Sequence, residues 1–539
     1  MTVAVNIDAG DLQSSIDARL AAWDKSGFPA RLWDRDPTLW FDPPEDEISN
    51  RLGWLTPGGT EGLGTIESFA EEARAEGLTD VVLLGMGGSS LAPEVFASVF
   101  QDVDGPKLTV LDSTHPDAVT RVAGAVDPKT TLYVVASKSG TTLETLSFLR
   151  YLWNRVGAAV DEPGTRFVAI TDPESSLAAL GAERNFRAVF LAPPDVGGRF
   201  SALIEFGLVP AALVGIDLSR LLAATDEAVF ACGPDIPAAQ NPALHLGAAL
   251  GEFALAGRDK VVFEPTPQYA ALPVWIEQLL AESLGKDGNG ILPVADGTAT
   301  PAPDRLRFAI GPNPTDPPVS PSVAMSLDDV YDVGGAMYIL EMATAAAGAV
   351  LGVHPFDQPD VQLAKSLAHT AMTEGLDGFD VHEWTLDDND TPEHLSTLLA
   401  KAGPGGYVAI QAYLEQTGAT AQRLQAIADT IADGTGAVVT IGYGPRFLHS
   451  TGQFHKGGPA TGVFLQIVDH PSAKVAVPET DYAFSELITA QSFGDQAALS
   501  DRDRPVGMIC LGDAGPADLP RLREMIADVL ADEDDGEPL

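Results

Sequence analysis

Short apolar runs that alternate with helical stretches constrain the fold of this 539-residue chain more than any other feature. The runs fall into three series. The first occupies residues 81–86, 107–113, 131–138, 166–172 and 187–193, the second 260–265 and 305–311, and the third 406–414, 437–444, 462–468 and 506–512. Short buried β-runs separated by helices indicate parallel sheets that helices cover on both faces. The sequence therefore predicts an α/β protein with doubly wound parallel sheets.

The three series predict several domains, in line with a prior of about 150 residues per domain. We expect an N-terminal helical arm over residues 1–60, with an amphipathic helix at 12–23. The following segments are a first α/β domain at 61–235, a second at 236–380, a polar linker at 382–394, a C-terminal α/β segment at 395–515 and an acidic tail at 530–539. The C-terminal segment could stand alone or complete the second domain.

The chain is strongly acidic, with a formal net charge of −44 from 76 acidic and 32 basic residues. A nucleic-acid partner is not expected, because binding to phosphates needs a basic surface. The same charge disfavours an anionic membrane surface. The apolar run 334–353 contains Glu341, so we interpret it as a buried helix and not as a membrane span.

Cysteine usage and the N-terminal sequence favour the cytoplasm. Cys232 and Cys510 lie far apart and neither has metal-ligand spacing, so neither a disulfide framework nor a zinc ribbon is expected. The first ten residues contain no basic segment followed by an apolar one, which argues against secretion. We therefore predict a cytoplasmic protein.

A glycine-rich turn at 83–94 (LLGMGGSSLAPE) follows the first apolar run. Gly85, Gly87 and Gly88 permit close approach of a ligand, and the free amides of a helix start attract anions. A dinucleotide fingerprint, with Asp112 downstream, fails because Ser90 stands at the third glycine position. A P-loop fails because no Gly-Lys-Ser/Thr closes the turn. A plain strand-to-helix turn remains the alternative.

A second turn, at 136–153, concentrates hydroxyl groups and one ammonium group. Residues 141–144 (TTLE) have capping-box spacing before an apolar face, which predicts that a helix begins there. The polar side chains at this helix start are Ser137, Lys138, Ser139, Thr141 and Thr142. Such a group favours a dianionic phosphate. A simple N-cap, which needs one hydroxyl, is the alternative.

Two charged residues in later motifs could do chemistry. Arg199 follows two glycines in DVGGRFS, where its permanent charge could stabilise an oxyanion, although a lone arginine is more often a surface ion pair. Glu282 follows Trp275, Gln278 and Leu279 on a helical face, and partial desolvation would make it a better general base. Taken alone, a helical glutamate is usually a solvated surface residue.

Two further segments carry weaker signals. In 354–365, Gln358 and Lys365 bracket an expected helix start, and spacing alone says little about them. The glycine-rich loop 442–459 holds His449 and His455. A metal site is conceivable there, but only two ligands are visible, and histidine on such a loop suits proton transfer better. We predict no metal and no cofactor.

Five of these segments together resemble the phosphoglucose isomerase family. GMGGSSLAPE, SKSGTTLET, DVGGRFS, AESLGK and FDQPDVQLAK occur in the order and approximate spacing of that family, over residues 83–365. The five motifs together are highly specific for the family, although each motif alone is weak evidence. The chain is most similar to a divergent bacterial branch that also occurs fused to transaldolase, and no transaldolase portion is evident here.

The resemblance implies two sugar-isomerase (SIS) α/β domains with a hexose phosphate between them, and no cofactor. It assigns the phosphate to Ser137, Lys138, Ser139 and Thr142, and the sugar to Gly88 and Ser89. Glu282 would move the proton between C1 and C2 through a cis-enediol(ate), and Arg199 would stabilise the charge that develops. Lys365 and a histidine would open the pyranose ring, and Gln358 would contact the substrate.

The chain departs from the family pattern in three places. The Gly-Gln-His segment that usually supplies the ring-opening histidine is missing, and GQFHKGGP offers His455 about 90 residues beyond Lys365, with His354 and His449 as rivals. Because family members often contribute this histidine from the neighbouring subunit, we expect a homodimer with a shared active site. The other departures are Gly140 and Asp360.

The function that the resemblance implies is reversible isomerisation of glucose 6-phosphate and fructose 6-phosphate, in glycolysis and gluconeogenesis. One alternative is an isomerase that also accepts mannose 6-phosphate, but Gln358 argues against it because such members tend to carry threonine there. Another is a non-catalytic sugar-phosphate regulator, but neither terminus supplies a basic DNA-binding module. Glu282 and Arg199 together also argue for an enzyme.

Overall fold

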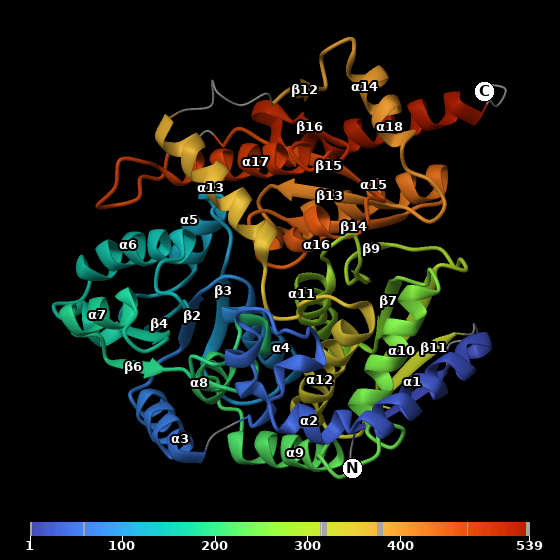
Figure 1. Cartoon of the computed structure of the whole chain (residues 1–539). Coiled ribbons are helices and arrows are strands. Elements are labelled where there is room, and N and C mark those ends of the chain that lie inside the picture. Colours follow the sequence, from blue (N-terminus) through green and yellow to red (C-terminus); the bar gives the residue numbers. More distant parts are fainter. Residues whose placement is uncertain are drawn as a thin grey trace. The chain divides into compact units, whose positions relative to one another are not determined.

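The computed structural model of the chain describes residues 3–57, 60–312, 314, 321–374, 381–471 and 473–534. It divides into two compact units (Figure 1). The first unit comprises Met1–Asp112, Ala125–Pro293 and Asp304–Asp357. The second comprises Ser113–Gly124, Val294–Pro303 and Gln358–Leu539. Each unit is described separately below.

The first unit contains a five-stranded parallel sheet in the order β3-β2-β4-β5-β6. Its strands are β2 (Asp80–Leu84), β3 (Lys107–Leu111), β4 (Thr131–Ala136), β5 (Phe167–Thr171) and β6 (Ala188–Leu191). Every residue of β4 and β5 is buried, as expected for central parallel strands. Its helices are α3 (Thr60–Ala75), α4 (Leu91–Val99), α6 (Leu143–Gly157), α7 (Ser176–Glu183) and α8 (Glu205–Leu213). The first predicted α/β layer is confirmed.

A second five-stranded sheet in the same unit has the order β1-β11-β10-β7-β8. Its strands are β1 (Val3–Asp8), β7 (Lys260–Pro265), β8 (Leu292–Val294), β10 (Arg305–Gly311) and β11 (Ser322–Leu327). Strands β7, β10 and β11 are parallel, whereas β1 joins β11 antiparallel. The expected N-terminal arm is therefore not wholly helical. Its first residues alternate in burial and form an edge strand, and helices α1 (Gln13–Ser26) and α2 (Phe28–Trp33) follow.

Helix α12 (Asp332–Leu351) lies at the centre of the helical layer of this second sheet. It contacts α9 (Leu218–Ala231), α10 (Pro242–Leu255) and α11 (Leu272–Leu284). Close approach to α10 depends on Gly247, because a Cβ there would lie 2.6 Å from the carbonyl oxygen of Ala343. Among the described residues, α12 alone is long and apolar enough to cross a membrane, and 94% of its apolar window is buried. The expected buried helix is confirmed.

The second unit contains a six-stranded sheet in the order β12-β16-β15-β13-β14-β9. Its strands are β9 (Gly297–Thr298), β12 (Glu383–Thr385), β13 (Tyr407–Tyr413), β14 (Val438–Tyr443), β15 (Gly462–Val468) and β16 (Val506–Cys510). All pairs are parallel except β14 with β9. The helices are α5 (Pro116–Ala125), α13 (Pro359–Glu374), α14 (Thr391–Leu399), α15 (Gly418–Thr435), α16 (Gly452–Gly457), α17 (Phe484–Ser500) and α18 (Leu519–Asp534).

The C-terminal α/β strands form a sheet of their own and do not extend the second sheet, which decides between the two alternatives left open for this segment. One expectation for this part of the chain needs correction. The segment 382–394 is not a simple linker, since it contains β12 and the start of α14, and Trp384 packs against the core of the unit. Of the expected acidic tail, residues 531–534 are the last turn of α18, and 535–539 lie outside the described residues.

Candidate active site

Arg199 and Glu282 form a buried ion pair in the first unit. Arg199 lies in a 3-10 turn (Gly198–Phe200) after β6, and Glu282 lies near the end of α11. Arg199 Nη1 is 3.2 Å from Glu282 Oε1, and the two side chains are 3% and 11% exposed. One turn earlier on α11, Gln278 Nε2 donates to Glu282 Oε2 at 2.9 Å. The structure thus joins two residues that would each, taken alone, be expected at the surface.

Several oxygens fix the guanidinium of Arg199. Its Nε donates to Ser283 Oγ at 2.7 Å, and its Nη2 donates to the carbonyls of Pro355 and Asp357 at 2.7 and 2.9 Å. Burial lowers the pKa of Arg199, while the Glu282 carboxylate raises it. An arginine keeps its charge even so. Its cation is therefore held in one orientation beside the carboxylate.

The two glycine-rich turns pack backbone to backbone. A Cβ on Gly88 would lie 2.0 Å from the carbonyl oxygen of Gly198 and 2.9 Å from the amide of Arg199. Ser201 Oγ ties the turns together by donating to the carbonyls of Gly198 (2.6 Å) and Gly88 (3.3 Å). Glycine at 88 is thus required for packing under Arg199. Its predicted contact with sugar, like that of the half-buried Ser89, stays a prediction.

The predicted phosphate loop lies between β4 and α6. Ser137 Oγ and Thr142 Oγ1 share a hydrogen bond of 2.9 Å, as do Ser139 Oγ and Thr141 Oγ1. Gly140 has a positive φ of 71° and donates its amide to Ser137 Oγ. The helix begins at Leu143, where the sequence predicts, but its N-cap is Thr142 and not Thr141, the residue that the capping box would require. Thr142 makes no side-chain cap hydrogen bond among the described contacts, and its hydroxyl pairs with Ser137 instead.

Lys138 has a carboxylate partner that the sequence did not reveal. Its Nζ lies 2.6 Å from Asp172 Oδ2 and 3.3 Å from the carbonyl oxygen of Pro194. Burial raises the pKa of Asp172, and the ion pair with Lys138 opposes that rise. Asp172 lies directly after β5, next to β4, so the carboxyl ends of adjacent parallel strands bring the two together. The loop is therefore less cationic than its sequence suggests.

Lys286 is a second buried cation that sequence reasoning missed, although it closes the AESLGK motif. Its Nζ lies 2.7 Å from Asp357 Oδ1 and donates to the carbonyl of His354. Burial and the nearby Arg199 lower its pKa to about 8. Arg199 and Lys286 both bind residues 354–357, so two buried cations hold this segment in place.

The candidate histidines occupy different surroundings. His354 Nε2 lies 2.8 Å from the carbonyl of Asp46, and its Nδ1 accepts the amides of Phe356 and Asp357, so both ring nitrogens serve the fold. His455 is 3% exposed, and its Nδ1 lies 3.1 Å from Gln411 Nε2. Burial, then Lys456 and Arg504, lower its pKa well below the ordinary value. The rival His449 is half-buried and ends the 3-10 turn Arg446–His449.

The remaining predicted residues belong to the second unit. Gln358 is exposed and directly precedes α13, which carries Lys365, whose side chain lies outside the described part. Asp360, one of the departures from the family pattern, makes specific contacts with its neighbours. Gln453 Oε1 accepts its amide at 2.9 Å, and Gln453 Nε2 donates to its Oδ2 at 2.7 Å. Arg502 pairs with the other oxygen. The GQFHK segment thus anchors the start of α13, and the roles of Gln358, Lys365 and His455 stay predictions.

Comparison with known proteins identifies sequence relatives of this chain. The family model for phosphoglucose isomerase matches residues 66–290. A glucose-6-phosphate isomerase of Rubrobacter xylanophilus is 30% identical over 401 residues, which cover 62% of this chain and 90% of that protein. One from Thermus thermophilus is 33% identical over 272 residues, or 48% of this chain and 63% of that protein.

Solved structures share the fold. A hypothetical protein from Thermus thermophilus is 27% identical, with a TM-score of 0.58 over 69% of this chain and all of that one. A glucose-6-phosphate isomerase from Chlamydia trachomatis, 20% identical, has a TM-score of 0.51 over 64% of this chain and 78% of that one. At that identity the second likeness concerns the fold alone. By its sequence relatives, the chain belongs to the phosphoglucose isomerase family.

Proposed function

We propose that the chain catalyses the reversible isomerisation of glucose 6-phosphate and fructose 6-phosphate. The observation that carries the proposal is the buried pair of Arg199 and Glu282, 3.2 Å apart, in the family's motifs. In the reaction, Glu282 takes a proton from C2 of the open-chain aldose, and a cis-enediol(ate) forms. The same carboxyl group returns the proton to C1 while the hydroxyl proton on O2 moves to O1, and the ketose forms.

Arg199 supplies the electrostatic part of this mechanism. Its fixed cation lies where negative charge develops on the enediolate oxygens, and a cation that needs no reorganisation stabilises such charge most. Ser283 and the carbonyls of residues 355 and 357 hold its Nε and Nη2, so Nη1 is aimed at Glu282. One carboxylate that serves two adjacent carbons is sufficient for the proton transfer.

The loop of residues 137–142 is proposed to anchor the phosphate. Its hydroxyls and amides gather at the N-terminal end of the 15-residue helix α6, where the helix dipole favours an anion. A remote phosphate contributes binding energy that can hold C1 and C2 against Glu282. Gly88 and Ser89 are proposed to line the sugar.

Three further parts of the proposal come from the family resemblance. Lys365 and His455 open the pyranose ring, and Gln358 contacts the substrate. Family members often take the histidine from a neighbouring subunit, so the proposal includes a homodimer with a shared site. From the cysteine usage, the N-terminal sequence and the acidic charge, we further propose that the enzyme acts in the cytoplasm and binds neither nucleic acid nor membrane.

A carboxylate-to-amide substitution tests the proposal. Glu282→Gln keeps the size of the side chain but removes the base, so turnover should fall by about 10²–10⁴-fold. Fructose 6-phosphate binding, followed by calorimetry, should persist. The matched control is Glu277→Gln on the same helix, which should leave turnover unchanged. Near-normal activity of Glu282→Gln in an assay coupled to glucose 6-phosphate oxidation would remove the proposed mechanism.

A further inference from the structure

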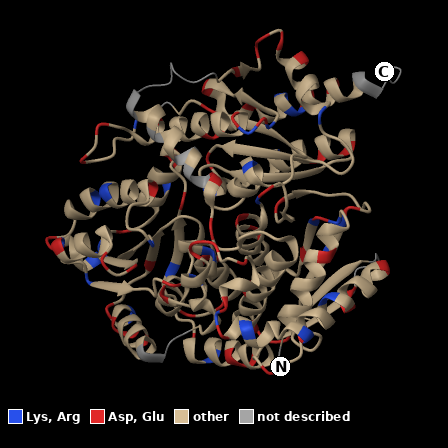
Figure 2. Cartoon of the chain, viewed as in Figure 1, with Lys and Arg blue, Asp and Glu red and all other residues tan. Residues whose placement is uncertain are grey.

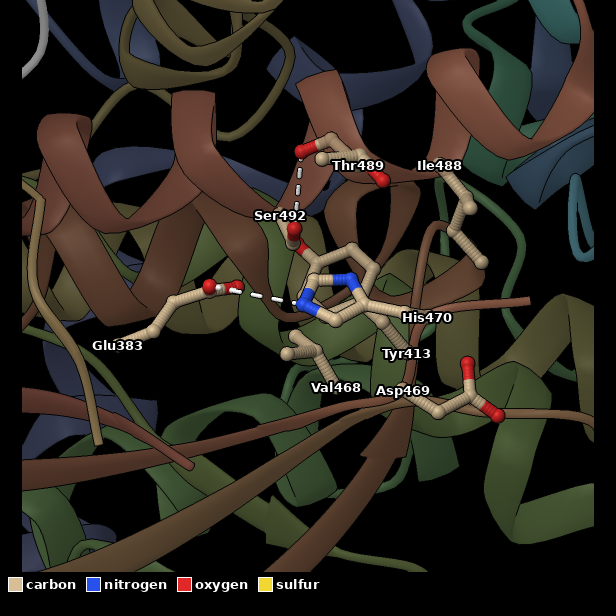
Figure 3. Close-up of a pocket in the computed structure, with 8 residues that line it drawn as sticks. All are labelled: Glu383, Tyr413, Val468, Asp469, His470, Ile488, Thr489 and Ser492. Atoms are coloured by element: carbon tan, nitrogen blue, oxygen red, sulfur yellow. Dashed lines mark hydrogen bonds and ion pairs between the residues drawn. The ribbon is translucent and has the colours of Figure 1, made fainter. Parts of the chain in front are cut away.

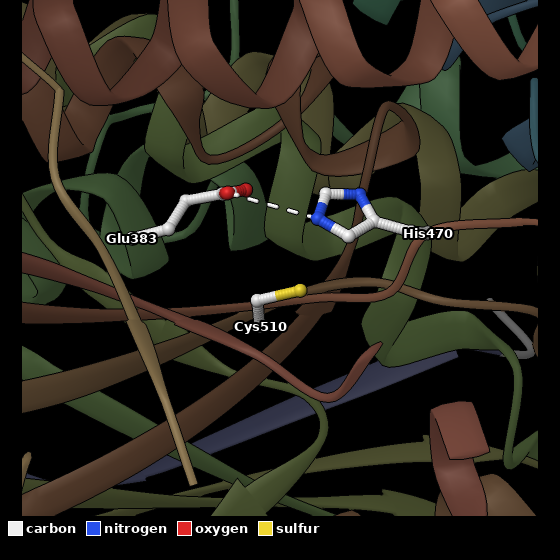
Figure 4. A group of neighbouring side chains, drawn as sticks. All are labelled: Glu383, His470 and Cys510. Atoms are coloured by element: carbon white, nitrogen blue, oxygen red, sulfur yellow. Dashed lines mark ion pairs between the residues drawn. The ribbon is translucent and has the colours of Figure 1, made fainter. Parts of the chain in front are cut away.

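Three side chains of the second unit bring a sulfur, a nitrogen and an oxygen together. The ligand atoms of Glu383, His470 and Cys510 all lie within 4.8 Å of one another. The carboxylate and the imidazole point toward one another and the thiol lies beside them (Figure 4). Glu383 Oε2 is 3.7 Å from His470 Nε2.

Sheet topology explains why residues so far apart in sequence meet here. Strands β12, β16 and β15 are neighbours in the sheet. Glu383, in β12, is in register with Met508, two residues before Cys510, so both side chains emerge on one face. Cys510 ends β16 beside Val468, and His470 follows two residues after β15. Two of the groups thus come from adjacent strands, and the third follows the end of the next strand.

A pocket opens beside this group. Glu383 and His470 line it together with Tyr413, Val468, Asp469, Ile488, Thr489 and Ser492 (Figure 3). The Asp469 carboxylate is turned elsewhere, to His115 Nε2 at 3.2 Å. The other carboxylate oxygen of Glu383, Oε1, is buried without a hydrogen-bond partner among the described residues. A buried acceptor in that state costs free energy, which a bound cation would offset.

The thiol of Cys510 is also suited to a metal ion, because it is buried and only weakly hydrogen-bonded among the described contacts. It is 4% exposed and accepts only a long hydrogen bond, 3.4 Å, from the amide of Gly512 among the described contacts. A dication would stabilise the thiolate form of Cys510 and balance the Glu383 carboxylate beside it.

We propose that Glu383, His470 and Cys510 bind one divalent transition-metal ion, with Zn²⁺ as the best match. Thiolate, imidazole and carboxylate are the ligands of tetrahedral zinc, whereas Mg²⁺ and Ca²⁺ prefer oxygen ligands alone. Three protein ligands leave a fourth position for a water molecule, and the pocket that Glu383 and His470 line lies beside the group. The site is separate from the residues proposed for isomerisation and does not depend on that proposal.

The ion would stabilise the edge of the sheet. Strand β12 has three residues and pairs only with β16 among the described strands, so its own hydrogen bonds hold it weakly. A metal bound to β12, β16 and the end of β15 would fasten all three. Metal that binds the folded state and not the unfolded one raises stability by mass action.

Cobalt spectroscopy on the full-length chain tests the site. After treatment with a chelator, the protein is titrated with Co²⁺, and a thiolate-to-cobalt charge-transfer band should grow to one ion per chain. Zn²⁺ should displace it. Cys510→Ser should abolish the band, and His470→Ala should weaken Zn²⁺ binding by at least about 10-fold. Isomerase turnover should be the same before and after the chelator.

Matched controls come from the first unit. Cys232→Ser removes the other buried thiol and His245→Ala removes a half-buried histidine, and neither should change the band. The His470 side chain is 52% exposed, so His470→Ala should fold even if Cys510→Ser does not. A wild type without the band, a band that survives in Cys510→Ser, or unchanged Zn²⁺ affinity in His470→Ala would each overturn the proposal.

Discussion

Each unit buries a cation beside a carboxylate inside a motif that the sequence marks, and two such pairs differ in how far the carboxylate is exposed. In the first unit, Arg199 lies 3.2 Å from Glu282, whose side chain is 11% exposed. In the second, Lys456 lies 2.5 Å from Asp495, whose side chain is 0% exposed. The carboxylate of the first pair is partly exposed and can contact a ligand, whereas that of the second pair is fully buried.

The partners of the fully buried pair explain its presence. Gln466 Nε2 donates to Asp495 Oδ2 at 2.9 Å and to Gln411 Oε1 at 3.0 Å, and Gln411 in turn contacts His455. Gln411 and Gln466 are in register on adjacent strands β13 and β15. This chain of polar side chains holds α16 and α17 to the sheet. A buried ion pair is therefore a sign of catalysis only where it keeps some exposure.

Arg199→Lys is expected to have the largest effect on activity among the variants that sharpen this comparison. Lysine keeps the charge but cannot reproduce the contacts of Nε and Nη2 with Ser283 and the carbonyls of Pro355 and Asp357. We expect kcat to fall by about 10²–10³-fold, and the unfolding free energy to fall by about 1–3 kcal/mol because buried acceptors lose their donors. Steady-state kinetics measures this effect, with the exposed Arg220→Lys as control. Unchanged kcat would mean that Arg199 does not act on the transition state.

His455→Ala tests whether the buried chain of polar side chains, which reaches His455 through Gln411, also takes part in the reaction. The family resemblance implies a ring-opening histidine, and we propose His455 for that role, so turnover on the cyclic sugar should fall by about 10²-fold. The measurement is the coupled assay with fructose 6-phosphate, beside a thermal unfolding curve, and His449→Asn is the matched control. Unchanged ring-opening kinetics together with a lower Tm would assign His455 to the network alone.

Lys456→Met should act on stability. It leaves Asp495 buried without its cation, which typically costs about 3–5 kcal/mol of unfolding free energy. The double variant Lys456→Met with Asp495→Leu should recover most of that loss, because no buried charge is left. Denaturant unfolding measures both. A loss of kcat in Lys456→Met without a loss of stability would place this pair in the reaction instead.

Asp360→Ala should have a smaller effect on stability, in the range of about 1–3 kcal/mol. It removes the acceptor of Gln453 Nε2 and Arg502 at the start of α13. In a double-mutant cycle with Gln453→Ala, the two losses should not add, because they break the same contact. Additive losses would show that Gln453 and Asp360 do not stabilise each other in solution.

Particular residues show what the sequence could predict. The strand Arg305–Gly311 was predicted to the residue, because its apolar residues mark a buried parallel strand even though Arg305 and Arg307 interrupt them. Strands β1 and β12 were missed, since their burial comes from partners at Ser322–Leu327 and Val506–Cys510, far along the chain. The same limit applies to the site. Family motifs identified Arg199 and Glu282, but Asp172, Ser283 and Lys286 become relevant only through contacts that folding creates.

The smallest expected effect concerns salt and the acidic surface. Acidic side chains outnumber basic ones over both units (Figure 2), and the proposed substrate is an anion. Lys138 is already paired with Asp172, so the phosphate loop has little spare positive charge to oppose the field. Salt shortens the Debye length from about 30 Å at 0.01 M to about 8 Å at 0.15 M, which screens distant charges more than contacts within the loop. KM should therefore fall a few-fold over this range while kcat stays constant. A KM that rises steadily with salt would show that local cations, and not the surface charge, govern the approach of substrate.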